Sequence, residues 1–250
     1  MLKVFSPDNI FTRLLAESLS VLTNAEISYY PAASISNKLQ NDECDIAIIP
    51  SFDLLSHNEY FISEKFGISF TTGLSNSYLY FIPGKREINK LLISGDVSSN
   101  EIVISKILFM EKFEIELEPV LDSSPVKLFE ENYLIAGDKN FETKFLKSGL
   151  SLADEITDQI EFPYVNFAVV SKNKKLLNFG ENEPDEEKLY EKLQSILESK
   201  NLGVEAKSYI NEQFYSVNFN LKNFSEALVE LLRLPYYHGI VEELKELNFI

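Results

Sequence analysis

Hydrophobic and polar positions alternate along the first fifty residues in a way that predicts strands separated by helices. Apolar runs at residues 2–5, 25–30 and 45–49 have the length and composition of strands. Between them, residues 11–22 carry apolar side chains at helical spacing, and residues 34–41 predict a shorter helix. Because this alternation builds parallel sheets covered by helices, we expect an α/β fold.

A second series of elements follows after residue 67. Strands are predicted at 68–72, 78–82, 91–94, 114–120, 133–136 and 165–170. Helical stretches are predicted at 98–109, 126–129, 141–148, 187–199, 204–214, 224–234 and 236–247, with a break at Pro235. This series indicates another α/β unit followed by a helical C-terminal part.

Composition limits the partners of the chain. The 250 residues contain 23 Lys and Arg against 39 Asp and Glu, a net charge of −16 that repels nucleic acid and anionic membrane surfaces. A single cysteine allows no internal disulfide, and the first residues lack the pattern of a secretory signal, so we expect a cytoplasmic protein. No apolar run is long enough to span a membrane, and no Cys/His cluster has metal-ligand spacing.

Polar side chains follow the predicted strands at their carboxyl ends, where open α/β sheets bind ligands. These candidate site residues are Ser6, Asn9, Ser51, Ser75, Asn76, Ser98, Ser99 and Asp138. Hydroxyls, amides and helix N-termini can hold a small carboxylate without a buried counter-charge. The same residue types also cap helices and form turns, so both interpretations stay open. Asp138 in particular could be the N-cap of a helix at 141–148 or a polar wall of the site.

The usual catalytic groups lie in unpromising surroundings. His57 and His238 occur in polar or C-terminal segments without a nucleophile nearby in sequence, and Cys44 is flanked by two acidic residues that disfavour its thiolate. The sequence contains no Walker loop, dinucleotide fingerprint or nucleophile elbow. We therefore expect that any catalysis needs no metal, cofactor or covalent intermediate.

Six segments give the chain a resemblance to a known family. In order and spacing it resembles the chorismate dehydratases of the futalosine route to menaquinone. The matching segments are Ser6-Pro7-Asp8-Asn9, Asp45-Ile46-Ala47-Ile48-Ile49-Pro50-Ser51, Gly73-Leu74-Ser75-Asn76-Ser77-Tyr78-Leu79, Asp96-Val97-Ser98-Ser99-Asn100, Leu134-Ile135-Ala136-Gly137-Asp138-Lys139 and Glu161-Phe162-Pro163-Tyr164-Val165-Asn166-Phe167-Ala168. The resemblance implies a two-lobed type II periplasmic-binding-protein fold with a ligand cleft between the lobes. We expect residues 1–93 and 186–250 to form lobe one and residues 94–185 to form lobe two.

The resemblance also implies a function. A family member is a hydro-lyase that removes water from chorismate to give 3-[(1-carboxyvinyl)oxy]benzoate, without a cofactor. On this interpretation Asn9 and Ser51 act in catalysis. The residues expected to bind the substrate are Ser6, Ser75, Asn76, Ser98, Ser99 and Asp138. The expected partner is thus a small carboxylate; the oligomeric state is not indicated.

Two departures keep alternatives open. Phe11 stands where the family usually has Arg, and Glu101-Ile102 stands where it has Thr-Ser. Glu101 suits the capping box of a helix that begins near Ser98. A cytoplasmic binding or sensing protein without turnover fits these departures. The naphthoate synthase of the same route is a further alternative, but neither histidine lies in a matching motif.

Overall fold

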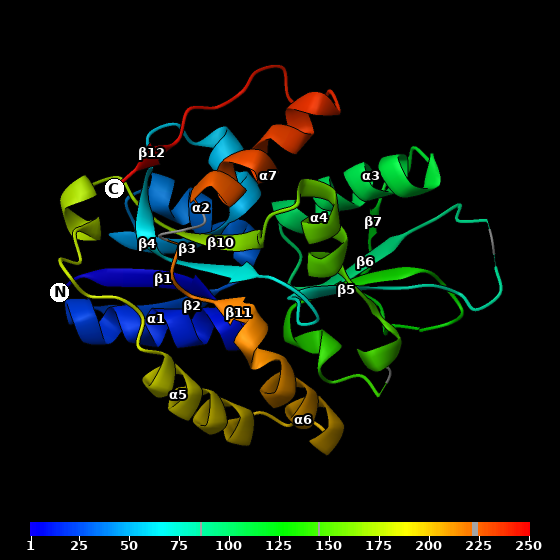
Figure 1. Cartoon of the computed structure of the whole chain (residues 1–250), viewed down its shortest axis with the longest axis horizontal. Helices are drawn as coiled ribbons and strands as arrows, with labels where there is room; N and C mark the ends of the chain where they lie inside the picture. The colour runs from blue at the N-terminus through cyan, green and yellow to red at the C-terminus, as the bar shows by residue number, and fades with distance from the viewer. Residues whose placement is uncertain (86, 145, 222–224) are drawn as a thin grey trace.

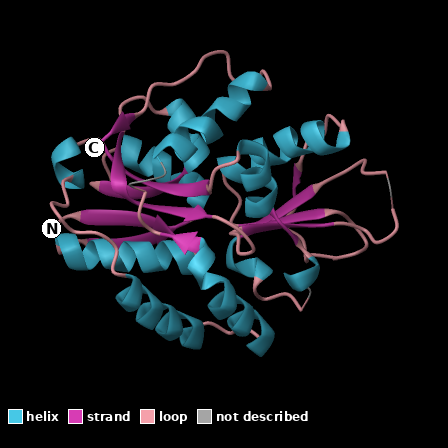
Figure 2. Cartoon of the chain, viewed as in Figure 1, coloured by secondary structure: helices cyan, strands magenta, loops and turns pink. Residues whose placement is uncertain are grey.

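Two β-sheets, each covered by helices, form the chain in the computed structural model (Figure 1). The structure describes residues 1–250 apart from 86, 145 and 222–224. We call the larger sheet with its helices the larger lobe, and the smaller sheet with its helices the smaller lobe. Figure 2 shows the strands of the two sheets pointing toward one another across the centre of the molecule. The predicted α/β class is confirmed.

The larger sheet has the strand order β11-β4-β10-β3-β1-β2, with β12 paired to β4. Its strands are β1 (Lys3–Pro7), β2 (Glu26–Tyr30), β3 (Ile46–Pro50), β4 (Phe61–Phe70), β10 (Tyr164–Ser171), β11 (Val217–Asn218) and β12 (Asn248–Phe249). As the alternating pattern predicts, β1 pairs in parallel with β2 and β3. Strand β10 runs antiparallel between β3 and β4, so a late segment of the chain lies in the middle of the early sheet.

The helices of the larger lobe bury one apolar face each. They are α1 (Ile10–Thr23), α2 (Ala32–Gln40), α5 (Glu186–Ser199), α6 (Val204–Gln213) and α7 (Ser225–Tyr237), with the 3₁₀ turn η1 (Ser51–Ser56) after β3 and η4 (Lys174–Leu177) and η5 (Phe214–Ser216) further on. Phe11, Leu14 and Leu15 of α1 are fully buried, as their helical spacing predicts.

The smaller sheet has the order β7-β6-β8-β5-β9. Its elements are β5 (Ser77–Tyr80), β6 (Leu92–Gly95), α3 (Ser99–Phe113), β7 (Val120–Leu121), β8 (Tyr133–Ala136), the 3₁₀ turns η2 (Gly137–Asn140) and η3 (Leu146–Ser148), β9 (Leu150–Ser151) and α4 (Leu152–Ile160). Strands β6 and β8 are parallel neighbours, so their carboxyl ends lie side by side at the edge that faces the larger lobe (Figure 1).

The strand pairing places both crossings between the lobes earlier in the chain than the sequence predicts. Strands β5 and β6 belong to the smaller sheet and β10 belongs to the larger one. The chain therefore crosses between β4 and β5, and again between α4 and β10, rather than after residues 93 and 185. Both lobes are built from the same strand–helix repeat, so hydrophobic periodicity does not reveal where the chain changes sheet.

Several predicted helices are absent or altered among the described residues. The segment 141–148 has no α-helix, and neither 126–129 nor 238–247 is helical. The predicted break at Pro235 is wrong, because α7 continues through Pro235 to Tyr237 and Pro235 lies in its last turn. The predicted strand 114–120 is reduced to Val120–Leu121, and Phe224 of the predicted helix 224–234 lies outside the described residues. Over the part of the chain described, no helix combines the length and apolar character needed to cross a membrane.

Candidate functional site

The N-termini of two helices of the larger lobe face the smaller lobe and receive carboxylates from it. The N–H of Ile10, which begins α1, donates to Asp138 Oδ1 at 2.9 Å. The N–H of Ala32, which begins α2, donates to Asp96 Oδ1 at 2.9 Å. Helix N-termini carry unpaired N–H groups and a positive dipole end, so they favour anionic oxygens. The lobe junction therefore contains two anion-binding positions that the chain itself occupies.

Each of these carboxylates belongs to an aspartate that follows a glycine at the end of a strand. Gly95 ends β6 and Gly137 follows β8, and both have positive φ, at 99° and 73°. A Cβ on Gly95 would lie 2.0 Å from the carbonyl oxygen of Ala136, so only glycine fits there. Because β6 and β8 are parallel neighbours, Asp96 and Asp138 leave the same edge of the sheet together.

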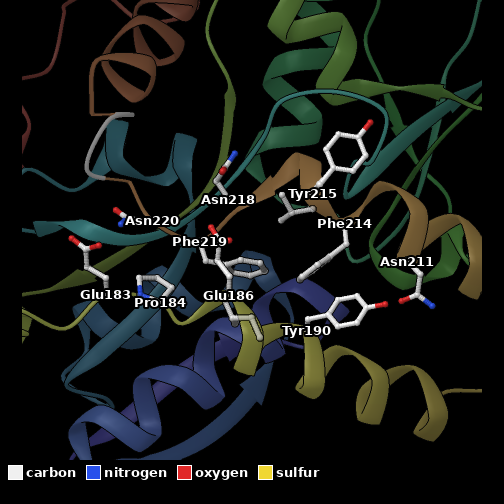
Figure 3. A pocket seen from close by; sticks show the side chains of 12 residues that line it. Glu183, Pro184, Glu186, Tyr190, Asn211, Phe214, Tyr215, Asn218, Phe219 and Asn220 are labelled. Atoms are coloured by element: carbon white, nitrogen blue, oxygen red, sulfur yellow. The ribbon is translucent and has the colours of Figure 1, made fainter.

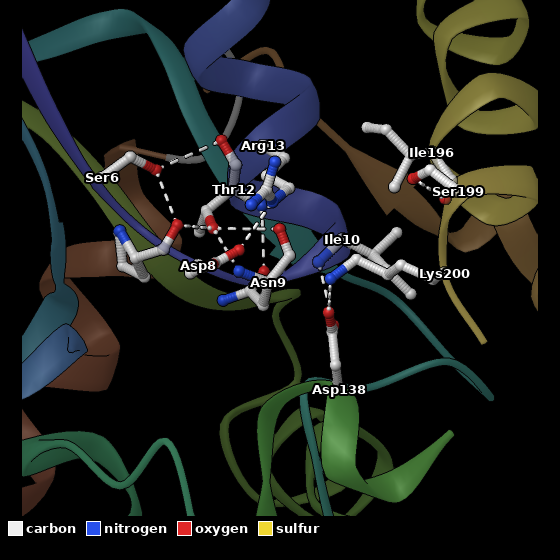
Figure 4. A network of polar contacts seen from close by, with 11 residues as sticks. Ser6, Asp8, Asn9, Ile10, Thr12, Arg13, Asp138, Ile196, Ser199 and Lys200 are labelled. Carbon is white, nitrogen blue, oxygen red and sulfur yellow. Dashed lines mark hydrogen bonds and ion pairs between the residues drawn. The ribbon is translucent and has the colours of Figure 1, made fainter. Parts of the chain in front are cut away.

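Asn9 and Thr12 cap helix α1 beside Asp138 (Figure 4). Asn9 Oδ1 accepts from the Thr12 N–H at 3.0 Å, and the Asn9 N–H donates to Thr12 Oγ1 at 3.3 Å. The predicted site residue Ser6 donates to the Pro7 carbonyl at 3.0 Å. The Asn9 amide nitrogen Nδ2 is buried and has no hydrogen-bond partner among the described residues. Asn9 thus combines a capping role with an unused donor.

An ion pair with Lys200 holds Asp138 at the α1 terminus (Figure 4). Lys200 follows α5, so this contact also joins the two lobes. Burial raises the pKa of Asp138 above its usual value, and the Lys200 ammonium and the Ile10 N–H act in the opposite direction. Asp138 is not the N-cap of a helix at 141–148, because that helix does not form.

Ser51 and Asn100 connect η1 to the strand β10 and to helix α3. Ser51 Oγ donates to the carbonyl of Val165 at 2.7 Å. Asn100 Oδ1 accepts from the Phe52 N–H at 3.1 Å, and Asn100 Nδ2 donates to the carbonyl of Asn166 at 2.7 Å. The Asn166 side-chain oxygen Oδ1 is buried without a hydrogen-bond partner in the described part of the chain. A third N-terminus of the larger lobe thus receives an oxygen from the smaller lobe.

Glu101 caps α3, as the Ser-x-x-Glu pattern predicts. It accepts from the Ser98 N–H at 2.8 Å and from Ser98 Oγ at 2.6 Å, and its other oxygen accepts from Ser77 Oγ at 2.7 Å. Burial raises the pKa of this carboxyl group, and the serine hydrogen bonds oppose the rise. The hydroxyl of the predicted binding residue Ser98 therefore donates a hydrogen bond to Glu101.

The remaining candidates lie at the same junction or close behind it. Ser75 Oγ accepts from the N–H groups of Ser77 and Ala153 at 3.1 and 3.2 Å and supports a turn. The Asn76 carbonyl accepts from the Gly137 N–H, while its side-chain Oδ1 is buried without a hydrogen-bond partner in the part of the chain described.

A cavity of about 430 Å³ opens between α2, η1 and the start of α3. Ser99 lines it and donates to Asp53 Oδ1 at 2.5 Å, and Ser36 donates to the other oxygen of Asp53. Burial raises the pKa of Asp53, and the two serine hydroxyls oppose this rise. Polar side chains from both lobes therefore line this cavity beside the junction.

The structure brings most predicted site residues together but buries them. Six of them are at most 4% exposed: Ser6, Asn9, Ser51, Ser75, Asn76 and Ser98. These six side chains are thus covered by the rest of the chain. The ligand roles assigned to these residues remain predictions.

Sequence reasoning missed four residues of the junction: Asp96, Asn100, Asn166 and Lys200. The first three lie inside segments that carry the family resemblance, and Asp96 repeats the Gly-Asp pattern of Asp138. These signals could have identified them. Lys200 follows a helix with no distinguishing pattern.

The cysteine and the two histidines lie in different surroundings, and His57 lines the cavity that Ser99 and Asp53 also line. Burial, together with the neighbouring acidic side chains, raises the pKa of the Cys44 thiol to about 12. The ring of His57 stacks on Tyr60 with centroids 4.6 Å apart, and His238 lies 3.3 Å from Glu111.

Comparisons with solved structures settle the fold. A conserved Candida albicans gene product, described as showing the generic periplasmic-binding-protein fold, aligns with a TM-score of 0.61 and 12% identity over 97% of this chain and 91% of that one. The chain has the periplasmic-binding-protein fold. The two-lobed arrangement that the sequence resemblance implies is thereby confirmed.

Two other solved structures share this fold. An Archaeoglobus fulgidus protein aligns with a TM-score of 0.62 and 14% identity over 96% of this chain and 98% of that one. The alkanesulfonate-binding protein of Xanthomonas axonopodis pv. citri, bound to MOPS, aligns with a TM-score of 0.59 and 12% identity over 98% and 95%. No family model and no curated protein matches the chain.

Proposed function

We propose that the chain binds a small organic anion between its lobes. The observation that carries this proposal is the pair of helix N-termini whose N–H groups hold Asp138 and Asp96 at 2.9 Å. A ligand carboxylate offers the same two oxygens as an aspartate side chain and can replace it there. Because the net charge is −16, these local dipoles supply the attraction for an anion.

Three unpartnered amide atoms support a ligand that also contains polar groups other than its charge. Asn9 Nδ2 is a donor, while Asn76 Oδ1 and Asn166 Oδ1 are acceptors, and all three are buried without hydrogen-bond partners among the described residues. Each such atom costs about 1–3 kcal/mol when it stays unpaired. A ligand that carries both a carboxylate and a hydroxyl group would satisfy donors and acceptors of this kind.

Chorismate is the anion that we propose, on the strength of the sequence resemblance, and dehydration is the proposed reaction. A proton leaves one ring carbon and hydroxide leaves the adjacent carbon; together they form water, and the electrons of the C–H bond complete the aromatic ring. The step needs no oxidant and no cofactor. A carboxylate of the substrate serves as the base, while Asn9 and Ser51 orient the reacting ring.

One observation favours binding without turnover as the second candidate. Glu101 accepts hydrogen bonds from the hydroxyl groups of Ser98 and Ser77, so these donors are not directed at a substrate. A protein that keeps the anion positions but lacks these donors would bind the molecule and release it unchanged.

Incubation with chorismate distinguishes the two candidates. Mass spectrometry should detect a product lighter by one water with the unaltered protein. Asn9→Ser keeps a capping oxygen but removes the amide donor, and should slow turnover at least about tenfold. The matched control is Asn173→Ser, which alters another capping asparagine at η4. Intact chorismate with a raised melting temperature would favour binding alone; intact chorismate and an unchanged melting temperature would reject chorismate as the ligand.

A further inference from the structure

A second cavity lies within the larger lobe, away from the residues of the junction. It has a volume of about 570 Å³, in the range of small-molecule sites, and is bounded by the start of α5 and by the segment that connects α6 to β11 (Figure 3). All of its lining residues lie between positions 183 and 220. None of the residues predicted to bind a substrate belongs to this set.

Aromatic rings form much of the cavity wall. The centroid of Phe214 lies 6.2 Å from that of Tyr190 and 5.9 Å from that of Phe219. Tyr190 is 47% exposed and Tyr215 is 73% exposed, so large ring surfaces remain open to a ligand. Aromatic faces carry partial negative charge and attract cations that lie against them.

The charged groups of the cavity are acidic. Of the twelve described residues that line it, Glu183 and Glu186 carry charge and none is basic. Figure 3 shows Glu183 on the side of the cavity opposite Tyr190. Asn211 and Asn218 add amide groups to the rim. The acidic side chain of Glu186 beside exposed aromatic rings makes a site suited to a positively charged organic group.

Helix capping alone does not explain this arrangement. Asp185 is the N-cap of α5 and pairs with Lys188, so the helix already has its capping carboxylate. Glu186 and Glu187 both lie in the first turn and meet the same helix dipole, but only Glu186 lines the cavity. Comparing Glu186 with Glu187 therefore distinguishes contact with a bound ligand from the effect of the helix dipole.

We propose that this cavity binds a small organic cation whose alkylated ammonium group lies against Tyr190 and Phe214. The carboxylate of Glu186, one helical turn before Tyr190 on α5, balances its charge. The proposal is independent of the anion site at the lobe junction, because the two sites share no residue.

Calorimetric titration of the full chain with choline tests the proposal. The matched neutral probe is 3,3-dimethylbutan-1-ol, which has the shape of choline without its charge. Choline should bind with a saturable signal and at least about tenfold more tightly than the neutral alcohol. Equal binding of the two probes, or no binding of choline, would overturn the proposal.

Substitutions locate the binding. Tyr190→Leu should weaken choline binding about tenfold, whereas Tyr237→Leu, which alters an exposed tyrosine of α7, should leave it unchanged. Glu186→Gln should weaken it several-fold more than Glu187→Gln. Equal effects of the two glutamate variants would mean that negative charge acts only at long range, which would contradict the site. Unchanged choline binding by Tyr190→Leu would also contradict it. Circular dichroism of each variant establishes that the fold is intact.

Discussion

Glu101 is a buried carboxyl group that binds two serine hydroxyls, one close in sequence and one distant. Glu101 is 1% exposed, and its carboxyl group accepts hydrogen bonds from Ser77 and Ser98. The local spacing of Ser98 and Glu101 predicts the cap, because both partners lie in one helical turn. The contact with Ser77 is not predictable in this way, since Ser77 begins a strand and is brought close only by the packing of α3 on the smaller sheet.

Glu101→Ala should destabilise the fold by about 2–4 kcal/mol, because it leaves the Ser77 and Ser98 donors buried without an acceptor. Urea unfolding measures the loss. The exposed Glu26 provides a control, since Glu26→Ala should change the free energy of unfolding by less than about 0.5 kcal/mol. Equal losses for the two variants would contradict the buried network.

Glu101→Gln tests the raised pKa of this carboxyl group. The folded chain keeps the Glu101 proton at pH values where the unfolded chain has lost it, so stability from this group is complete at low pH. It is lost as the pH rises from the ordinary value of 4.5 toward the folded pKa. The wild-type free energy of unfolding should therefore fall relative to that of Glu101→Gln across this range. A wild-type free energy of unfolding that rises relative to that of Glu101→Gln as the pH rises would mean that the pKa of Glu101 is lowered instead.

At the scale of elements, the three helices that meet the junction begin differently. Helices α1 and α3 carry their own capping boxes, while α2 starts after Pro31 without a side-chain cap. The α2 terminus depends on Asp96, which is 64 residues away in sequence. Local motifs therefore predict where α1 and α3 begin, but no local motif predicts which distant carboxylate completes α2 or α1.

Asp96→Ala should loosen the first turn of α2. Loss of the hydrogen bond to the Ala32 N–H should cost about 1 kcal/mol, which corresponds to about fivefold faster amide exchange in that turn. Hydrogen–deuterium exchange resolved by peptide measures this change. Asp158→Ala, at an exposed position of α4, should leave the exchange of α2 unaltered. Uniformly faster exchange throughout the larger lobe would indicate general destabilisation rather than a lost cap.

At the scale of the whole molecule, the two lobes are held together by contacts that a ligand would have to replace. Asp96 and Asp138 from the smaller lobe bind helix termini of the larger one, and Lys200 reinforces the second contact. Periodicity predicts the α/β class and the resemblance predicts two lobes. The crossing points between lobes depend on strand pairing over long sequence distances, as β10 between β3 and β4 shows.

The double variant Asp96→Ala/Asp138→Ala should shift the molecule toward an open form. Small-angle X-ray scattering should then give a larger radius of gyration than for the unaltered chain, because both carboxylate bridges are lost. The exposed double variant Asp158→Ala/Glu26→Ala provides the control. An unchanged radius of gyration in the junction variant would mean that other contacts keep the lobes closed.

The most direct test of the anion site is a titration of the ¹⁵N-labelled chain with chorismate, followed by the amide signals of Ile10 and Ala32. If the ligand takes the positions of Asp138 and Asp96, both signals should shift saturably with one dissociation constant, while the amide of Tyr237 on α7 should not move. Unchanged Ile10 and Ala32 signals at saturating chorismate, or shifts confined to another face of the molecule, would contradict binding of this anion between the lobes.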